Sequence, residues 1–259
     1  MQIALTIAGS DSGGGAGIQA DLKTFHRFGV FGTSVVTAIT AQNTRGVSAW
    51  EAVSVPLIRG QLDAVATDLR PAALKSGMLA DRPVIEAVAE GIRAHRLEPY
   101  VLDPVMVATS GDPLLAPDAV SAITEQLFPL AALVTPNLDE AELLLGRPVR
   151  SEAAMAEAAR QFVEVMGAGA ALVKGGHLAG AEAVDILYAD GTLHTFRHAR
   201  LATTSTHGTG CTLSAAITAQ LAFGRSLLDA VRDALAFVHR AIATAPGLGA
   251  GHGPLNHFA

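Results

Sequence analysis

The sequence has little of what several classes of protein need. Cys211 is the single cysteine among 259 residues, which excludes a disulfide within the chain and a cysteine-cluster zinc site. The 18 lysines and arginines occur singly and the formal net charge is −6, so no basic stripe is available for a nucleic-acid backbone. Glycine, proline or charge interrupts every apolar stretch well before the about 20 residues that span a bilayer. We expect no nucleic-acid partner and no membrane segment.

Two common nucleotide-binding signatures and a targeting signal are missing as well. The chain contains no Walker A sequence, and its first glycine-rich loop, residues 9–17, does not fit G-x-G-x-x-G. The N-terminus has the pattern of a strand, without the basic segment of a signal peptide. We therefore expect a cytoplasmic protein that does not use the common nucleotide-binding folds.

Short apolar runs alternate with segments of helical period along the chain, which predicts a mostly parallel α/β sheet with helices on both faces. The expected strands are residues 2–8, 33–40, 71–76, 99–102, 131–135 and 170–174. The expected helices are residues 17–28, 56–69, 82–95, 117–127, 138–145, 152–166, 209–223 and 226–244. Residues 183–188 and 192–196, which flank Asp190-Gly191, predict an antiparallel edge hairpin. No linker divides the sequence, so we expect one domain over residues 1–259, with an irregular tail from Pro246.

The loops that follow the strands are the expected ligand-binding segments, because ligands of open α/β sheets bind beyond the carboxyl ends of the strands. The first such loop, Gly9 to Gly17, is rich in glycine, which lets a backbone approach a ligand closely. A flexible turn capped by Asp11 or Ser12 explains the same composition equally well. Composition alone leaves both explanations open.

Three further loops carry charged or amide side chains at strand ends. Asp103 follows strand 99–102, in a loop that continues to residues 110–112; it can hold magnesium or phosphate, or form an Asp-Pro turn. Asn137 and Glu140 have the spacing of an N-cap with a capping box, which is a structural role. Lys174, before two glycines, can meet a phosphate or extend to solvent.

The segment Gly208-Thr209-Gly210-Cys211 opens a helix of small residues. Free N–H groups at such a helix start bind anions and can stabilise a phosphoryl group in transfer. The helix field is expected to lower the thiol pKa of Cys211. A nucleophilic cysteine with His207 as base is disfavoured, because His207 precedes the helix and need not face the thiol. A small buried cysteine without a chemical role is also possible.

Seven stretches together resemble the bacterial hydroxymethylpyrimidine/phosphomethylpyrimidine kinases of thiamine biosynthesis, in the ribokinase-like superfamily. The stretches are AGSDSGGGAGIQADLKTF, TAITAQNTRGV, KSGMLA, LDPVMVATSGDPLL, TPNLDEAELL, VKGGH and THGTGCTLSAA. The resemblance runs from Ile7 to about Phe223, with a weaker match at residues 253–257. It implies an ATP- and Mg²⁺-dependent kinase that phosphorylates 4-amino-5-hydroxymethyl-2-methylpyrimidine to its monophosphate and then to the diphosphate. A homodimer is also implied.

The resemblance assigns residues to the acceptor. Residues from Gly9 to Gly17, together with Asp21, are expected to border the pyrimidine. Gln42 is expected to hydrogen-bond the pyrimidine edge, since its amide both donates and accepts. Met78 and Val105 are expected to pack against the substrate.

It also assigns residues to the nucleotide. Asp103, Asn137 and Glu140 are expected to organise Mg²⁺ and the ATP phosphates, in part through water. Lys174 is expected to lie near the phosphate chain, and the Gly208–Cys211 turn, including Thr209 and Gly210, to hold the transferred group. Sugar kinases of the superfamily have an aspartate base where this chain has Cys211. Cysteine is typical of the pyrimidine kinases, and a loose transition state leaves little need for a base.

The sequence departs from the family pattern at two positions and leaves rival functions. Ser76 stands where isoleucine is expected, which could alter packing of the substrate pocket, and Ser205 stands where asparagine is expected. A pyridoxal or pyridoxine kinase is the nearest rival. A non-catalytic pyrimidine sensor and a cysteine hydrolase are disfavoured by the complete set of predicted phosphate-binding residues.

Overall fold

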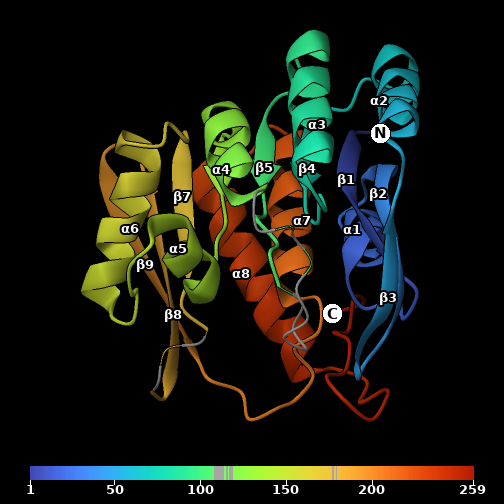
Figure 1. Ribbon diagram of the computed structural model, residues 1–259. Coiled ribbons are helices and arrows are strands. Elements are labelled where there is room, and N and C mark those ends of the chain that lie inside the picture. Colours follow the sequence, from blue (N-terminus) through green and yellow to red (C-terminus); the bar gives the residue numbers. More distant parts are fainter. Residues whose placement is uncertain (108–113, 115, 117–118, 177, 179) are drawn as a thin grey trace.

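Nine strands form one sheet in the order β3-β2-β1-β4-β5-β6-β7-β8-β9 (Figure 1). The computed structural model describes all residues except 108–113, 115, 117–118, 177 and 179. The strands are β1 (Ile3–Asp11), β2 (Phe31–Asn43), β3 (Gly46–Ala52), β4 (Ala73–Ser76), β5 (Tyr100–Leu102), β6 (Leu133–Val134), β7 (Ala170–Lys174), β8 (Glu182–Ala189) and β9 (Thr192–Ala199). The six strands β2, β1, β4, β5, β6 and β7 are parallel to one another. Strand β3 pairs antiparallel with β2, β8 with β7, and β9 with β8.

Helices lie between the strands along the chain, and two more follow the last strand. They are α1 (Gly17–Arg27), α2 (Val55–Asp68), α3 (Arg82–His95), α4 (Val120–Ala122), α5 (Leu138–Leu145), α6 (Glu152–Glu164), α7 (Thr209–Ala222) and α8 (Leu227–Ala243). A π-helical turn, η2 (Ile123–Leu127), and a 3₁₀ turn, η3 (Phe128–Leu130), follow α4. Within the described residues no helix combines the length and apolar character that a membrane span requires.

The sheet is buried on both faces because successive side chains of a strand point to opposite sides. On β5, Tyr100 and Leu102 belong to the large core beneath α2 to α6, whereas Val101 packs in a second core against α7 and α8. On β7, Val173 and Leu172 divide in the same way. A small third core joins α1 to α7. Continuous apolar strands with helices on each side are the pattern expected from the sequence.

The direction of the chain connections reverses between β1 and β4. From β1 the chain moves to β2 on one side, and after β3 and α2 it returns to β4 on the other side. The loops that leave β1 and β4 therefore diverge, and such a reversal opens a crevice at the carboxyl ends of the strands.

The predicted mostly parallel sheet with an antiparallel edge hairpin, β8 and β9, is confirmed. Strand β3, at the opposite edge, is missing from the prediction; most of its residues are exposed, so the sequence has no alternating apolar pattern there. The predicted helix 117–127 is not one regular helix: residues 117–118 lie outside the described part, and three short turns, α4, η2 and η3, follow. The tail from Pro246 forms no helix, as expected.

Candidate active site

A cavity of ≈ 580 Å³ lies at the carboxyl ends of the parallel strands. Loops after β1, β4, β5, β6 and β7 contribute to its lining, as does the start of α7. Most site residues predicted from the sequence line the cavity: Gly9, Gln42, Met78, Asp103, Val105, Asn137, Glu140, Lys174, Gly208, Thr209, Gly210 and Cys211. Asp21 does not line it, and of the predicted loop Gly9 to Gly17 the residues 12–15 do not. Residues 110–112 and His177, which belong to the quoted motifs, lie outside the described residues.

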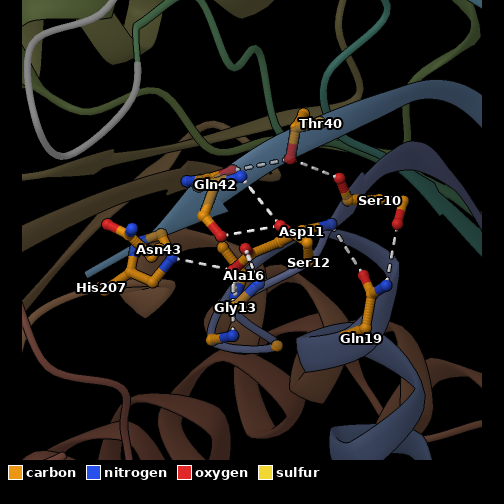
Figure 2. A network of polar contacts seen from close by, with 12 residues as sticks. Ser10, Asp11, Ser12, Gly13, Ala16, Gln19, Thr40, Gln42, Asn43 and His207 are labelled. Atoms are coloured by element: carbon orange, nitrogen blue, oxygen red, sulfur yellow. Dashed lines mark hydrogen bonds and ion pairs between the residues drawn. The ribbon is translucent and has the colours of Figure 1, made fainter. Parts of the chain in front are cut away.

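The loop after β1 is folded around the carboxylate of Asp11 (Figure 2). This carboxylate accepts hydrogen bonds from the backbone N–H groups of Gly13, Gly15 and Ala16 at 2.7, 2.9 and 2.8 Å. Its Oδ2 also lies 2.9 Å from Nε2 of His207. Burial opposes the charge, but the bonds from His207 and the backbone lower the pKa of Asp11 below its ordinary value. Asp11 thus holds the glycine-rich loop in one conformation.

Gln42 lies near the end of β2, beside this loop (Figure 2). Its backbone is fixed by Ser12, whose Oγ donates to the Gln42 carbonyl at 2.7 Å and accepts from the Gln42 N–H at 2.8 Å. Thr40 Oγ1 donates to the Ser10 carbonyl at 2.8 Å and to Gln42 Oε1 at 3.3 Å. The Gln42 amide therefore reaches the cavity from a rigid backbone.

An apolar wall faces the first loop. Met78 packs with Ala38 and Leu114, and Val105 packs against this cluster. A Cβ on Gly9 would lie 3.0 Å from the Met78 sulfur, so glycine lets the loop approach this wall closely. The pairing of β1 with β2 shifts register between Ala8 and Ser10, at the same glycine. The cavity is apolar next to Gln42, as a heterocyclic ring requires.

The opposite end of the cavity carries a partly buried lysine, Lys174, and two buried carboxylates. Lys174 Nζ lies 3.0 Å from Asp103 Oδ1 and 4.0 Å from Glu140 Oε2. Thr135 Oγ1 donates to Asp103 at 3.3 Å, and Ser214 Oγ, from α7, does so at 3.4 Å. Burial disfavours the charged carboxylate, but Lys174 and a second buried lysine hold the pKa of Asp103 below its usual range.

Asn137 and Glu140 form the capping box that the sequence predicts at the start of α5. Asn137 Oδ1 accepts from the Glu140 N–H at 2.9 Å, and Glu140 Oε2 accepts from the Asn137 N–H at 2.7 Å. Both residues nevertheless line the cavity. Burial raises the pKa of Glu140 to about 7. The nearby positive charge of Lys174 lowers this pKa and the negative charge of Asp103 raises it, but burial has the largest effect. A cation at this position would favour the ionised carboxylate.

The Gly208–Cys211 turn, which begins α7, approaches both ends of the cavity. Gly208 has φ +80°, and a Cβ there would lie 1.9 Å from the Gly15 carbonyl oxygen. A Cβ on Gly210 would lie 3.2 Å from Lys174 Nζ and 3.4 Å from Asp103 Oδ2. Thr209 holds the turn, since its hydroxyl donates to the Thr206 carbonyl at 2.7 Å. Among the described residues no side chain caps α7. The Thr209 N–H donates to the Thr206 carbonyl at 3.3 Å, and the next two residues of the first turn, Gly210 and Cys211, line the cavity together with Lys174.

Comparison with known proteins identifies the family of this chain. The model of the family described as phosphomethylpyrimidine kinase matches residues 11–256. This chain belongs to the phosphomethylpyrimidine kinase family. A hydroxymethylpyrimidine/phosphomethylpyrimidine kinase of Rhizobium meliloti is 56% identical over 99% of this chain and 97% of the relative. The thiamine biosynthesis bifunctional protein ThiED of Geobacter sulfurreducens is 49% identical over 98% of this chain, which spans 52% of that protein.

Solved structures agree with the family. A phosphomethylpyrimidine kinase from Clostridium difficile 630 superposes with a TM-score of 0.83 at 41% identity, over 93% of this chain and 100% of the other. An ADP complex of Bacillus subtilis pyridoxal kinase gives a TM-score of 0.92 at 39% identity, over 99% and 97%. The resemblance drawn from the motifs is thereby confirmed, and so is the fold that it implies.

Cys211 of this phosphomethylpyrimidine kinase family member does not have the lowered thiol pKa that the sequence suggested. Burial raises the pKa of Cys211 to about 12, and the nearby carboxylates of Asp21 and Asp103 act in the same direction. Lys75 opposes them and does not outweigh burial. Desolvation of the thiol outweighs the field of the helix start, so the predicted lowering of the Cys211 pKa is wrong. The His207 ring pairs with Asp11 instead, so His207 does not serve Cys211 as a base.

The state of Cys211 can be measured by alkylation. At pH 8 we expect iodoacetamide to modify the native protein at least about 100-fold more slowly than it modifies N-acetylcysteine, because so little of the thiol is ionised. The rate should continue to rise with pH through 9 without a plateau, as followed by intact mass. Labelling as fast as that of the free thiol, with a plateau below pH 8, would show a thiolate and contradict the assignment.

Two other expectations require correction in this member of the family. Asp21 is fully buried outside the cavity lining that the described residues form; it pairs with Lys75 at 3.0 Å and accepts from Thr6 Oγ1 at 2.6 Å. The Asp21 side chain extends from α1 toward Thr6 of β1 and Lys75 of β4. Because it is enclosed there, it cannot border the pyrimidine. Ser76 is also buried outside this lining, with Oγ 2.5 Å from the Tyr100 hydroxyl. Ser76 therefore contacts the neighbouring strand β5 and does not line the pocket.

Sequence reasoning missed one end of the cavity. This end is lined by Ala199, the last residue of β9, by Arg200 and Leu201, which follow it, and by His239 and Ile242 of α8. Arg200 donates to the Gly176 carbonyl at 2.6 Å, which ties the β9 end to the loop after Lys174. No motif marks these residues, because they contribute to the site through packing of distant elements. The one sequence feature that pointed to this region is the predicted edge hairpin, because these residues begin at its end.

Proposed function

We propose that the chain transfers the γ-phosphate of ATP to 4-amino-5-hydroxymethyl-2-methylpyrimidine and then phosphorylates the monophosphate to the diphosphate. The observation that carries this proposal is the single cavity with an amide and an apolar wall on one side and the Lys174–Asp103 pair beside the start of α7 on the other. The names of the curated relatives and the ADP complex of the pyridoxal kinase support it.

The acceptor would bind between Gln42 and the apolar wall. The Gln42 amide offers a donor and an acceptor in one plane, which complements an aminopyrimidine edge. Met78 and Val105 would contact the ring, and the loop from Gly9 to Gly17 would enclose it. Because Asp11 fixes this loop, the hydroxymethyl group would be held in one orientation toward the phosphate. Such orientation raises the rate, because the entropy of bringing the reacting groups together is lost on binding and not in the chemical step.

The phosphate chain would extend toward Lys174 and the Gly208–Cys211 turn. The lysine charge and the backbone N–H groups of Gly210 and Cys211, in the first turn of α7, would stabilise the negative charge on the transferred group. Such transfer passes through a loose transition state, so positioning and electrostatics carry most of the catalysis. Cys211, with a thiol pKa of about 12, stays neutral and would pack beside the transferred group rather than remove a proton.

Asp103 and Glu140 fit a magnesium ion bound with the nucleotide. Both are carboxylates in the same cavity, and Mg²⁺ is commonly held by one or two carboxylates together with substrate phosphates and water. The ion would neutralise charge on the phosphates while Lys174 orients them. The homodimer and the cytoplasmic location stay predictions.

Pyridoxal kinase is the second candidate, because the pyridoxal kinase of Bacillus subtilis has a TM-score of 0.92 to this chain. ATP turnover with the pyrimidine alcohol, its monophosphate and pyridoxal, each over a concentration series, separates the two activities. We expect both pyrimidines to support turnover with a higher kcat/KM than pyridoxal. Turnover with pyridoxal and with neither pyrimidine would reject the proposal and favour the second candidate.

A further inference from the structure

The C-terminal segment, residues 251–257, contacts three parts of the site that are far apart in the sequence. The His252 N–H donates to the Thr44 carbonyl at 2.7 Å, two residues beyond Gln42. The Gly253 carbonyl accepts from the His207 N–H at 3.1 Å. His257 Nε2 lies 3.2 Å from Thr212 Oγ1 in the first turn of α7. Figure 1 shows this segment in red beside β3 and the lower end of α8. It therefore connects the acceptor side with the phosphate side.

His207 contacts both the C-terminal segment and the loop from Gly9 to Gly17. His207 is buried, with 6% of the residue exposed. Its Nε2 lies 2.9 Å from Asp11 Oδ2, and its backbone pairs with Pro254 as an isolated β-bridge. A Cβ on Gly15 would lie 2.6 Å from His207 Cδ2 and 3.1 Å from the Pro254 Cβ. The ring is thus held between the first loop and the C-terminal segment, and has little room to move.

His207 directly precedes the turn that approaches Lys174. Its neighbour Gly208 lies so close to Gly15 that no side chain fits between them. A displacement of the ring would therefore move the Gly208–Cys211 turn relative to the loop from Gly9 to Gly17. A shift of about 1 Å at such a joint can cost about 10²-fold in rate.

We propose that His207 is a positioning residue: held by Asp11 and Pro254, it fixes the glycine turn that receives the phosphoryl group against the loop that borders the acceptor. This inference rests on the proposed function. When the joint loosens, the acceptor oxygen no longer lies in line with the phosphorus, and water can take its place. The bond from the γ-phosphorus to ADP then breaks while one forms to the water oxygen, which gives ADP, inorganic phosphate and a proton.

The test compares His207→Ala and His207→Gln with the wild type and with His26→Ala, a change at an exposed histidine of α1. ADP and phosphorylated pyrimidine are measured in the same reaction, together with kcat, KM for ATP and the unfolding midpoint. We expect His207→Ala to lower kcat by about 10- to 100-fold, to keep KM for ATP within about threefold, and to release more ADP than pyrimidine phosphate. His207→Gln keeps a donor near Asp11 and should recover most of the coupling, and His26→Ala should match the wild type.

A purely structural role predicts something different. Partial unfolding reduces the amount of active enzyme, which lowers both products together and leaves one ADP per phosphate transferred. That outcome in His207→Ala, or the same ratio of ADP to product in both His207 variants, would overturn the proposal. If the wild type itself forms no phosphorylated pyrimidine, the proposed function fails instead. The two failures are therefore distinguishable.

Discussion

Replacing Asp103 by asparagine is expected to lower kcat by about 10²–10³-fold, the usual loss when one preorganised electrostatic group is removed from a transfer site. Asparagine keeps the shape of the side chain and removes the charge that holds Lys174 at 3.0 Å. KM for the pyrimidine should stay within about threefold, because Gln42 and the apolar wall are untouched. Steady-state kinetics with saturating ATP and Mg²⁺ provide both constants.

Asp190→Asn is the matched control. Asp190 is exposed in the turn between β8 and β9, where asparagine suits the left-handed φ of +49°. It should leave kcat unchanged. Since Asp103 is buried with a charged partner, its replacement can also destabilise the fold by about 3–5 kcal/mol, so both variants are assayed below their unfolding midpoints. A folded Asp103→Asn protein with the kcat of the wild type would contradict the placement of the phosphate chain.

Replacing Gly208 by alanine is expected to lower kcat by at least about 10²-fold, because the turn must move away from the first loop. The new Cβ would lie 1.9 Å from the Gly15 carbonyl oxygen and 3.2 Å from the Ala16 Cα. The positive φ adds a cost of about 1–2 kcal/mol to the folded state. Kinetics and thermal unfolding are measured on the same preparation.

Gly191→Ala isolates the cost of the backbone conformation. Gly191 has φ +72°, and the described structure holds no atom within 4 Å of a Cβ built there. We expect this variant to lose stability by the cost of positive φ while kcat stays that of the wild type. If Gly208→Ala resembled Gly191→Ala in both measurements, the contact between the glycine turn and the loop would have no role in catalysis.

The parts of the fold and site that sequence reasoning predicts are those with local signals. The strand ends before Asp103 and Lys174 are apolar runs that stop at a polar residue, and the Asn137 capping box is a pattern within four residues. Glycine at 208 and 210 marks close backbone contacts, although the partner, Gly15, is distant in the sequence. Local patterns therefore locate the loops, and the parallel sheet brings them together.

The errors concern properties that depend on distant residues. Asp21 shares a motif with the first loop, but the helical turn points it at Lys75, which lies on β4. The pKa of Cys211 depends on how much water the surrounding chain removes, and no sequence pattern reports that quantity. His207 receives its role from Asp11 and Pro254, which lie near opposite ends of the chain.

The most direct test of the proposed reaction is a time course by mass spectrometry of the wild-type protein with the pyrimidine alcohol, ATP and Mg²⁺. The account predicts that the monophosphate forms first and is converted to the diphosphate, with one ADP released for each phosphate transferred. Unchanged pyrimidine after complete incubation, in a preparation that is folded and binds ATP, would contradict it.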